Sequence, residues 1–292
     1  MVGGRAWLLF KETVAGFLED GAMMSGAAIA YYAVFSLAPV LVIAVAIAGW
    51  VFGLDAARAE VASQVRDVMG DQAADTVNSM LATAGRRESG LMASLVSLGT
   101  ILVTATGTFG AVESALNTIW RGGDEPSSAL HATLRTRLAG LCLVLATGLL
   151  LIASLIASAA VTALKHYLEL LPHTEMLADA VNLLVSSLLL MVAVGALYRV
   201  LPNRSLAWRD VLVGAIATTV LLTGGRYLIG LYMAEAGVAS SYGAAGSVFV
   251  VLLWIYYSAL IFLLGAEFTK AWTKHYGSSH EARAQARAAS PG

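Results

Sequence analysis

The sequence predicts an all-α polytopic membrane protein, with six transmembrane helices and further amphipathic helices at the membrane surface. Hydrophobic residues make up 58% of the chain and charged residues only 13%, whereas soluble domains carry about 25% charged residues. The run Ala244–Ala266 contains no charged side chain over 23 residues. As a helix it would be about 34 Å long, enough to cross a bilayer. Five other apolar runs precede it, separated by polar connections.

These runs set the expected domain organisation. We expect a cytoplasmic N-terminal amphipathic helix in residues 1–26, a six-helix transmembrane domain in 27–272, and a disordered cytoplasmic tail in 273–292. The polar stretch 55–90 carries apolar side chains at helical spacing, so one or two amphipathic helices are expected there, on the outer side. The transmembrane spans are expected at 27–54, 91–111, 138–164, 177–198, 211–232 and 244–266.

The distribution of basic residues predicts the orientation in the membrane. Six spans place both termini on one side, and the segments of that side carry 12 Lys and Arg residues against 5 on the other side. Cytoplasmic loops are enriched in Lys and Arg, so both termini are expected in the cytoplasm. Residues 1–26 lack the short apolar core and cleavage site of a signal peptide, so the first span is expected to be retained.

The first span contains a proline and a polar face. Pro39 provides no backbone N–H and leaves the carbonyl of Phe35 without its helical donor, which predicts a kink. Tyr32, Ser36 and Pro39 are spaced i, i+4 and i+7 and share one face. A free carbonyl and two hydroxyl groups on that face would suit a polar path through the bundle. The alternative is ordinary helix packing with satisfied hydroxyl groups.

Two glutamates follow apolar runs at the expected cytoplasmic rim. Glu113 and Asn117 follow the second run, and Glu267 follows the sixth. Tyr256 and Glu267 are 11 residues apart, close to three helical turns, and therefore share a face. An inward-facing carboxylate at this depth predicts a proton or cation site. The alternative is that both glutamates form structural ion pairs at the interface.

Arg226 is a charged residue inside the fifth span. It lies about 24 Å along its helix from the cytoplasmic entry, at 1.5 Å per residue. Its guanidinium group could reach the outer headgroups, as long basic side chains do near helix ends. Alternatively, it could face a water-filled cavity and bind an anionic group. Both interpretations stay open at this point.

Composition and motifs exclude several other functions. The net charge of −1 argues against nucleic acid as a partner. Cys142 is the only cysteine, and the His166 and His173 pair indicates interfacial polarity rather than a metal site. The sequence has no GxxxxGK[ST] loop for ATP, and nothing in it points to a cofactor or a metal. We therefore do not expect an enzyme.

Four motifs stand out along the chain: AYYAVFSLAPVL at 30–41, ESALNTIW at 113–120, YRVLPN at 198–203, and SYGAAGSVFVVLLWIYYSALIFLLGAEF at 241–268. Together they resemble the YihY/virulence factor BrkB family, of the UPF0761 type. They occur in the family's order and extend over nearly all of the chain between Ala27 and Trp272. The resemblance implies six helices with cytoplasmic ends in the bacterial inner (plasma) membrane. Members have been linked to serum resistance and to transport, and an older label, ribonuclease BN, is regarded as a misassignment.

Two functions fit these observations, and a third does not. The first is a transporter or translocase of a small solute or a lipid, with membrane lipids as surroundings and an unknown solute or lipid as substrate. The second is a non-transporting protein that organises the envelope. Ribonuclease activity is not expected, because a metal-binding HxxH or paired-Asp motif is absent and the cytoplasmic loops are short. The many small residues would serve packing within the chain or a homo-oligomer equally well.

Overall fold

The computed structural model describes residues 2–69, 71–85, 107–120, 152–153, 156, 174–204, 206–236 and 246–277. Within these ranges the chain is all-helical and contains no β-strand. Residues 107–120 form a further helical segment. The helices are α1 (Val2–Glu19), α2 (Ala22–Phe52), α3 (Leu54–Met69), α4 (Asp71–Gly85), α7 (Thr174–Val200), α8 (Trp208–Ala236) and α10 (Gly246–His275).

Three of the described helices are long and apolar enough to cross a membrane. The qualifying stretches are Leu183–Val200 of α7, Trp208–Leu231 of α8 and Val248–His275 of α10. A fourth is added if α2, which bends by 49° between Leu37 and Val40, is counted as one span. Residue Pro39, which removes a helical hydrogen bond, lies at this bend.

Some helix boundaries differ from the expected ones. Helix α10 continues to His275, well past the expected end of its span at 266, so Glu267 lies inside a continuous helix. The charged residues near this end favour helical structure as much as the apolar run does, so they do not stop the helix. Helix α2 begins at Ala22, within the stretch assigned to the N-terminal domain. Most of the expected spans 91–111 and 138–164, and residues 278–292, lie outside the described residues.

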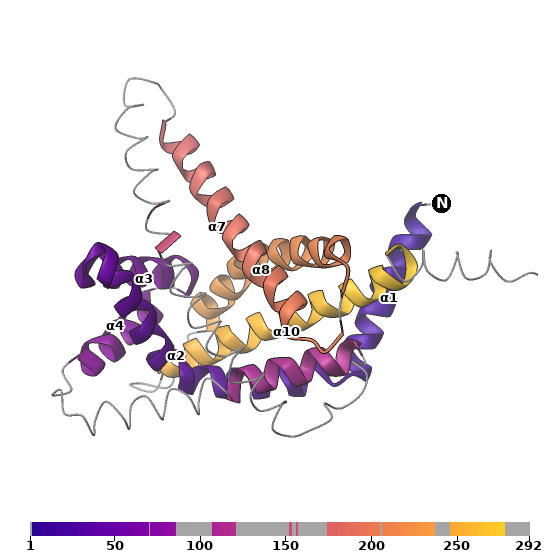
Figure 1. Cartoon of the computed structure of the whole chain (residues 1–292), viewed down its shortest axis with the longest axis horizontal. Helices are drawn as coiled ribbons and strands as arrows, with labels where there is room; N and C mark the ends of the chain where they lie inside the picture. Colours follow the sequence, from indigo (N-terminus) through magenta and orange to yellow (C-terminus); the bar gives the residue numbers. More distant parts are fainter. Residues whose placement is uncertain are drawn as a thin grey trace, which may run out of the picture.

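Helix α10 is the centre of the arrangement. It packs against α1, α2 and α8, while α7 packs against α8. Figure 1 shows α3 and α4 at one end of the molecule and α1 crossing the other end, with α10 running between them. The sequence explains this place for α10, because a helix that is apolar on nearly all sides needs apolar neighbours around it.

Helices α8 and α10 cross through two reciprocal glycine–threonine contacts. Gly214 of α8 lies against Thr269 of α10, and Gly265 of α10 lies against Thr218 of α8. Each threonine hydroxyl donates to the carbonyl of the glycine four residues earlier in its own helix, over 2.8 Å for Thr218 and 2.7 Å for Thr269. Small residues at a crossing let two backbones approach closely, and the threonines fill the space that the glycines leave.

The buried apolar side chains form two separate cores. The larger core joins the first half of α2 to the segment 107–120, α7, α8 and α10, and includes Ala22 and Ile29 of α2. The smaller core joins the second half of α2 to α3 and α4, and includes Ala44, Val45 and Ala48 of α2. The bend in α2 therefore lies between the parts of that helix that belong to the two cores.

Glycines with positive φ lie in two short connections between helices. Gly21, with φ of 65°, is followed directly by α2, and Gly53, with φ of 91°, is the single residue between α2 and α3. Other residues rarely adopt these backbone angles. The N–H of Gly53 donates to the carbonyl of Gly49 over 2.9 Å, which keeps the turn inside the hydrogen-bonding pattern of α2.

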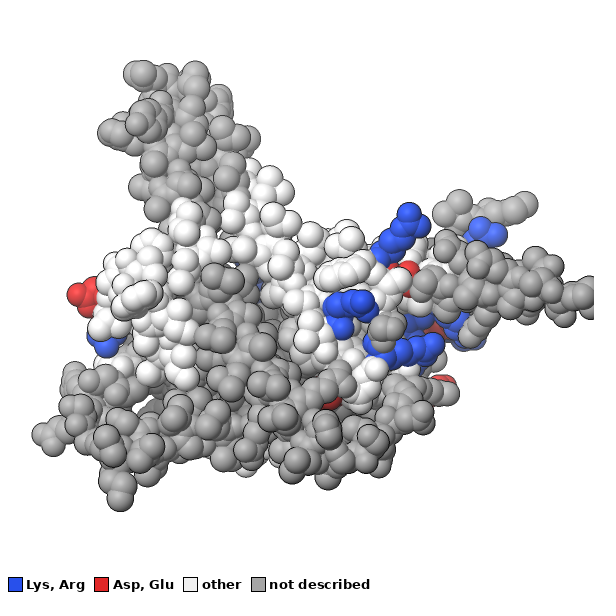
Figure 2. Space-filling model, in the orientation of Figure 1, with Lys and Arg blue, Asp and Glu red and all other residues white. Residues whose placement is uncertain are grey.

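Charged side chains gather toward the ends of the molecule. Figure 2 shows a group of Lys and Arg side chains over the end where α1 meets the end of α10, and a wide uncharged surface beside it. The exposed large apolar side chains of α7 and α8 include Leu184, Leu188, Val220 and Leu228. Such a surface is typical of a protein whose middle faces lipid.

Candidate polar site between α1 and α10

The most buried charged side chain of the described residues is Glu267, near the end of α10. It is 1% exposed, and its Oε2 lies 3.2 Å from the Nζ of Lys270, one turn later on the same helix. The same Nζ donates to Oδ2 of Asp20 over 2.5 Å. We name Asp20, Glu267 and Lys270 the Glu267 cluster. It places two carboxyl groups on one ammonium group, and it holds the end of α1 against α10.

The carboxylate of Glu267 is only partly satisfied. Its Oε1 is buried and has no hydrogen-bond partner among the described residues. The other oxygen, Oε2, lies directly over Gly16 of α1, where an added Cβ would be 2.5 Å away. Gly16 therefore provides the space that the carboxylate occupies. Buried carboxylate oxygens normally have hydrogen-bond partners, so Oε1, which has none among the described residues, is the candidate binding atom of this cluster.

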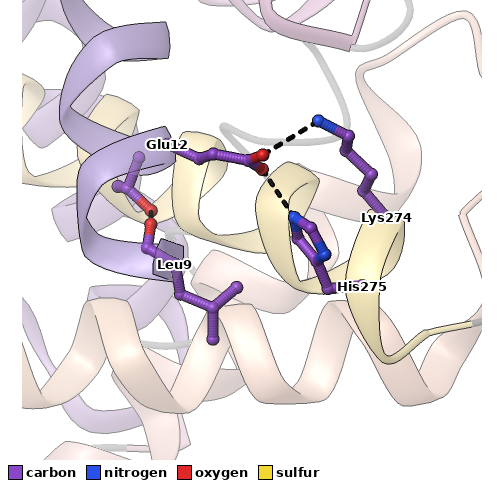
Figure 3. A network of polar contacts seen from close by, with 5 residues as sticks. Leu9, Glu12, Lys274 and His275 are labelled. Atoms are coloured by element: carbon purple, nitrogen blue, oxygen red, sulfur yellow. Dashed lines mark hydrogen bonds and ion pairs between the residues drawn. The ribbon is translucent and has the colours of Figure 1, made fainter. Parts of the chain in front are cut away.

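A second set of charges lies farther along the same helix contact. Glu12 of α1 accepts a hydrogen bond from Lys274 over 3.0 Å, and its other oxygen lies 2.8 Å from Nε2 of His275. Figure 3 shows both side chains of α10 reaching the one carboxylate. We name these three residues the Glu12 cluster. Burial raises the pKa of Glu12, but the hydrogen bonds and positive charges of Lys274 and His275 outweigh it and hold the pKa below its ordinary value of 4.5.

The polar face of the first span lies against the segment 107–120. The Ser36 hydroxyl is 3.0 Å from that of Thr108, and it also donates to the carbonyl of Ala33 over 3.2 Å. The ring of Tyr32 lies over Gly107, where an added Cβ would be 2.7 Å from Cδ1. Ser36 is buried and Tyr32 is 42% exposed. The structure thus joins these two residues to the second apolar run, at a place distinct from the Glu267 cluster.

The other predicted site residues have neighbours of their own. Asn117 accepts a hydrogen bond from the backbone N–H of Asn203 over 2.8 Å, which ties the segment 107–120 to the turn after α7. Tyr256 lies near Gly26 of α2. Glu113 is half-buried and has interactions of its own. Of the two predicted glutamates, Glu267 is therefore the buried one.

Arg226 points along the surface of α8. Its guanidinium group lies 5.1 Å from the centre of the Tyr227 ring, and Nη2 is 3.3 Å from the Tyr227 hydroxyl group. Tyr227 is 67% exposed. A basic side chain paired with an exposed aromatic ring is typical of the membrane interface.

The partners of Glu267 show what sequence reasoning missed. Lys270 is three residues from Glu267, so their pairing could have been read from helical spacing. Asp20 and Gly16 are nearly the whole chain away, and only the packing of α1 on α10 brings them there. Within the part of the chain that the structure describes, no group of three or more His, Cys, Asp and Glu side chains is placed to hold a metal ion.

Comparisons with known proteins agree with this membrane architecture. Residues 13–290 match the family model described as virulence factor BrkB. A UPF0761 membrane protein of Stenotrophomonas maltophilia is 31% identical over 268 residues, which cover 87% of this chain and 58% of that protein. A UPF0761 membrane protein of Alteromonas mediterranea is 28% identical over 264 residues, covering 89% of this chain and 86% of that protein.

The chain thus spans less than two thirds of the length of the Stenotrophomonas relative, and most of the length of the Alteromonas one. No solved structure matches the chain. The family model covers nearly the whole chain, including the helices that build the Glu267 cluster. The chain is therefore a membrane protein of the virulence factor BrkB family.

Proposed function

We propose that this protein is a transporter or translocase of a small solute or a lipid, with six spans and both termini in the cytoplasm of a bacterium. The observation that carries the proposal is the buried carboxylate of Glu267 in a membrane-spanning helix, with one oxygen lacking a partner among the described residues. Ionisable groups at such places are costly, and they commonly line substrate or ion paths.

The bent helix α2 supports the same proposal. Its bend lies next to Ser36 and Thr108, a pair of hydroxyl groups that links two apolar segments. Helices that are interrupted at membrane depth are common at transporter binding sites, where freed backbone groups and side-chain hydroxyl groups meet the substrate. A bent span also offers a place where the two parts of a bundle move relative to one another.

A non-transporting role in organising the envelope is the second candidate. It is favoured by the exposed apolar side chains of α1, where Trp7, Phe10 and Leu18 are 66%, 59% and 63% exposed. The rings of Trp7 and Phe10 are stacked with centroids 5.8 Å apart. An amphipathic helix with such a face binds in the interfacial layer of a bilayer. This surface is compatible with transport and does not require it.

Flux measurements on purified protein test the proposal. The full chain would be reconstituted into vesicles of phosphatidylethanolamine and phosphatidylglycerol. One assay follows a fluorescent phosphatidylethanolamine from the inner to the outer leaflet, and a second follows release of trapped carboxyfluorescein, a small anionic solute. We expect one of the two to exceed the rate of protein-free vesicles. That excess should disappear in Glu267→Gln.

Glu19→Gln is the matched control, because Glu19 is an exposed carboxylate of α1 beside Asp20. It should leave the flux unchanged. If neither probe moves faster than in protein-free vesicles, the transport proposal is contradicted and the envelope-organising role becomes the better one.

A further inference from the structure

The Glu267 cluster has an unbalanced charge when both of its carboxyl groups are ionised. Asp20 and Glu267 then carry two negative charges against the single positive charge of Lys270. The side chains of Glu267, Asp20 and Lys270 are 1%, 10% and 30% exposed. Water therefore screens little of the excess charge, and an uncompensated charge in such a place is costly. Uptake of one proton would make the cluster neutral.

The geometry indicates where that proton binds. Lys270 already occupies Oε2 of Glu267, and it also pairs with Oδ2 of Asp20. The buried oxygen without a partner among the described residues is Oε1 of Glu267. Protonation turns this oxygen into a neutral O–H group. Burying a neutral polar group without a partner costs less free energy than burying a charged one. Glu267 is therefore the group of the cluster that gains most from a proton.

The same geometry favours a proton over a metal cation. A sodium, magnesium or calcium ion needs several oxygen ligands around a vacant centre. Here the ammonium group of Lys270 lies between the two carboxylates, within 3.2 Å of both. A second cation placed beside it would be repelled. A proton needs one oxygen atom and no vacant centre.

Few other charges among the described residues act on the site. Of these residues, the charged groups that face Glu267 are Lys270 and Asp20. Helix α2 contains no charged residue between Ala22 and Phe52. Helix α8 brings Asp210 against Gly277, past the end of α10. The Glu12 cluster lies one to two turns farther along α10. In the part of the chain that the structure describes, the charge of the site is thus set by these three residues.

We infer that Glu267 is the proton-binding group that couples transport by this protein to a proton gradient, with Lys270 and Asp20 holding its counter-charges. This inference rests on the proposed transport function. A proton passes from water to Oε1 of Glu267 and forms the O–H bond there. The ion pair with Lys270 becomes a hydrogen bond from the ammonium group to a neutral carboxyl group. Lys270 keeps its ion pair with Asp20. The contact between the end of α1 and α10 then contains one ion pair instead of two.

Infrared difference spectroscopy of the full chain in lipid nanodiscs tests the proton site directly. Spectra taken in mildly acidic and mildly alkaline buffer should differ by the C=O band of a protonated carboxylic acid. That band should be missing in Glu267→Gln and present in Glu19→Gln. Glutamine has nearly the shape of the protonated acid, so we expect the variant to fold. Glu267→Asp should restore a band at a shifted frequency. A band that persists in Glu267→Gln would overturn the inference.

The vesicle assays separate this inference from the proposed function. With a pH gradient imposed, flux of the lipid or solute probe should increase in the wild type and fall to the protein-free level in Glu267→Gln. Flux that ignores the pH gradient, or follows a sodium gradient instead, would overturn proton coupling and support transport. A Glu267 band in a protein that moves neither probe would support the proton site and overturn the transport function.

Discussion

At the scale of single residues, a few side chains decide how the N-terminal helix is held. Glu12 of α1 and Asp20, the residue directly after α1, each pair with basic residues of the last turns of α10. Surface ion pairs are worth little singly. The inner pair is the more significant, because Asp20 is 10% exposed and Glu267 beside it is 1% exposed. The pairs of Glu12 with Lys274 and His275 are more exposed, so they fix the orientation of α1 on α10 more than they stabilise the fold.

The lowered pKa of Glu12 predicts a pH dependence for the outer contact. Because its pKa is lower in the folded protein than its ordinary value of 4.5, Glu12 stabilises the fold above that pH. The contribution is lost as the pH falls through the lowered pKa. Thermal unfolding in detergent, followed by intrinsic tryptophan fluorescence, should show Glu12→Gln less stable than wild type at neutral pH. The two midpoints should converge in acid, and a difference that stays constant with pH would contradict this assignment.

Sequence reasoning found Glu267 but not its environment. The glutamate was a candidate because it is the first charge after a long apolar run. Its burial depends on Gly16 and Asp20, which reach it only through the packing of two helices from opposite ends of the chain. No local pattern around residue 16 or 20 encodes that contact. The same holds for the hydroxyl pair of Ser36 and Thr108, which are 72 residues apart.

At the scale of helices, the reciprocal contacts of α8 and α10 are the most demanding packing in the described structure. A Cβ on Gly265 would lie 2.7 Å from the Tyr198 hydroxyl and 2.9 Å from Cβ of Thr218. The Tyr198 hydroxyl is fixed, since it donates to the carbonyl of Phe262 over 2.6 Å. Neither neighbour is the free end of a flexible side chain, so the helices would have to move apart.

We therefore expect Gly265→Ala to destabilise the protein by about 1–3 kcal/mol, as overpacked core substitutions do. The measurement is unfolding by sodium dodecyl sulfate in mixed micelles, followed by circular dichroism. Gly230→Ala on α8 is the control, because nothing lies within 4 Å of the added Cβ. It should be neutral or slightly stabilising. Equal effects of the two substitutions would show that the close approach at Gly265 has no energetic weight.

Hydrophobic runs predict the presence of the helices better than their ends. The runs at 177–198, 211–232 and 244–266 correspond to α7, α8 and α10. Helices α7 and α8 extend past their runs on both sides, while α10 begins two residues inside its run and extends past only its C-terminal end. The bilayer limits which residues are apolar, while backbone hydrogen bonding limits where a helix stops, and the two limits need not coincide. The bend of α2 was predictable because proline acts locally on its own helix.

At the scale of the whole molecule, the distribution of Lys and Arg predicts how the chain is oriented in the membrane. Basic side chains gather at the end where α1 meets α10 (Figure 2), and from the excess of Lys and Arg we expect this end to face the cytoplasm. The Glu267 cluster lies at this end. Our proposal of six spans requires two that fall mostly outside the described residues. Their presence was expected from composition alone, and it stays a prediction.

Fusion reporters test the orientation. We expect green fluorescent protein fused after Gly292 to fluoresce, and alkaline phosphatase at the same position to be inactive, because both termini are expected in the cytoplasm. Alkaline phosphatase fused after Gly85, at the end of α4, should be active. The reverse pattern would contradict the orientation, and equal activity at both positions would contradict an odd number of spans between them.

The division of α2 between two cores has a mechanical consequence. Its second half, α3 and α4 share one set of buried side chains, and a single residue, Gly53, joins α2 to α3. Nothing in that connection is long enough to absorb movement. A change of the angle near Pro39 would therefore move these helices together and shift α4 against α10 and α3 against α8, with which they are in contact.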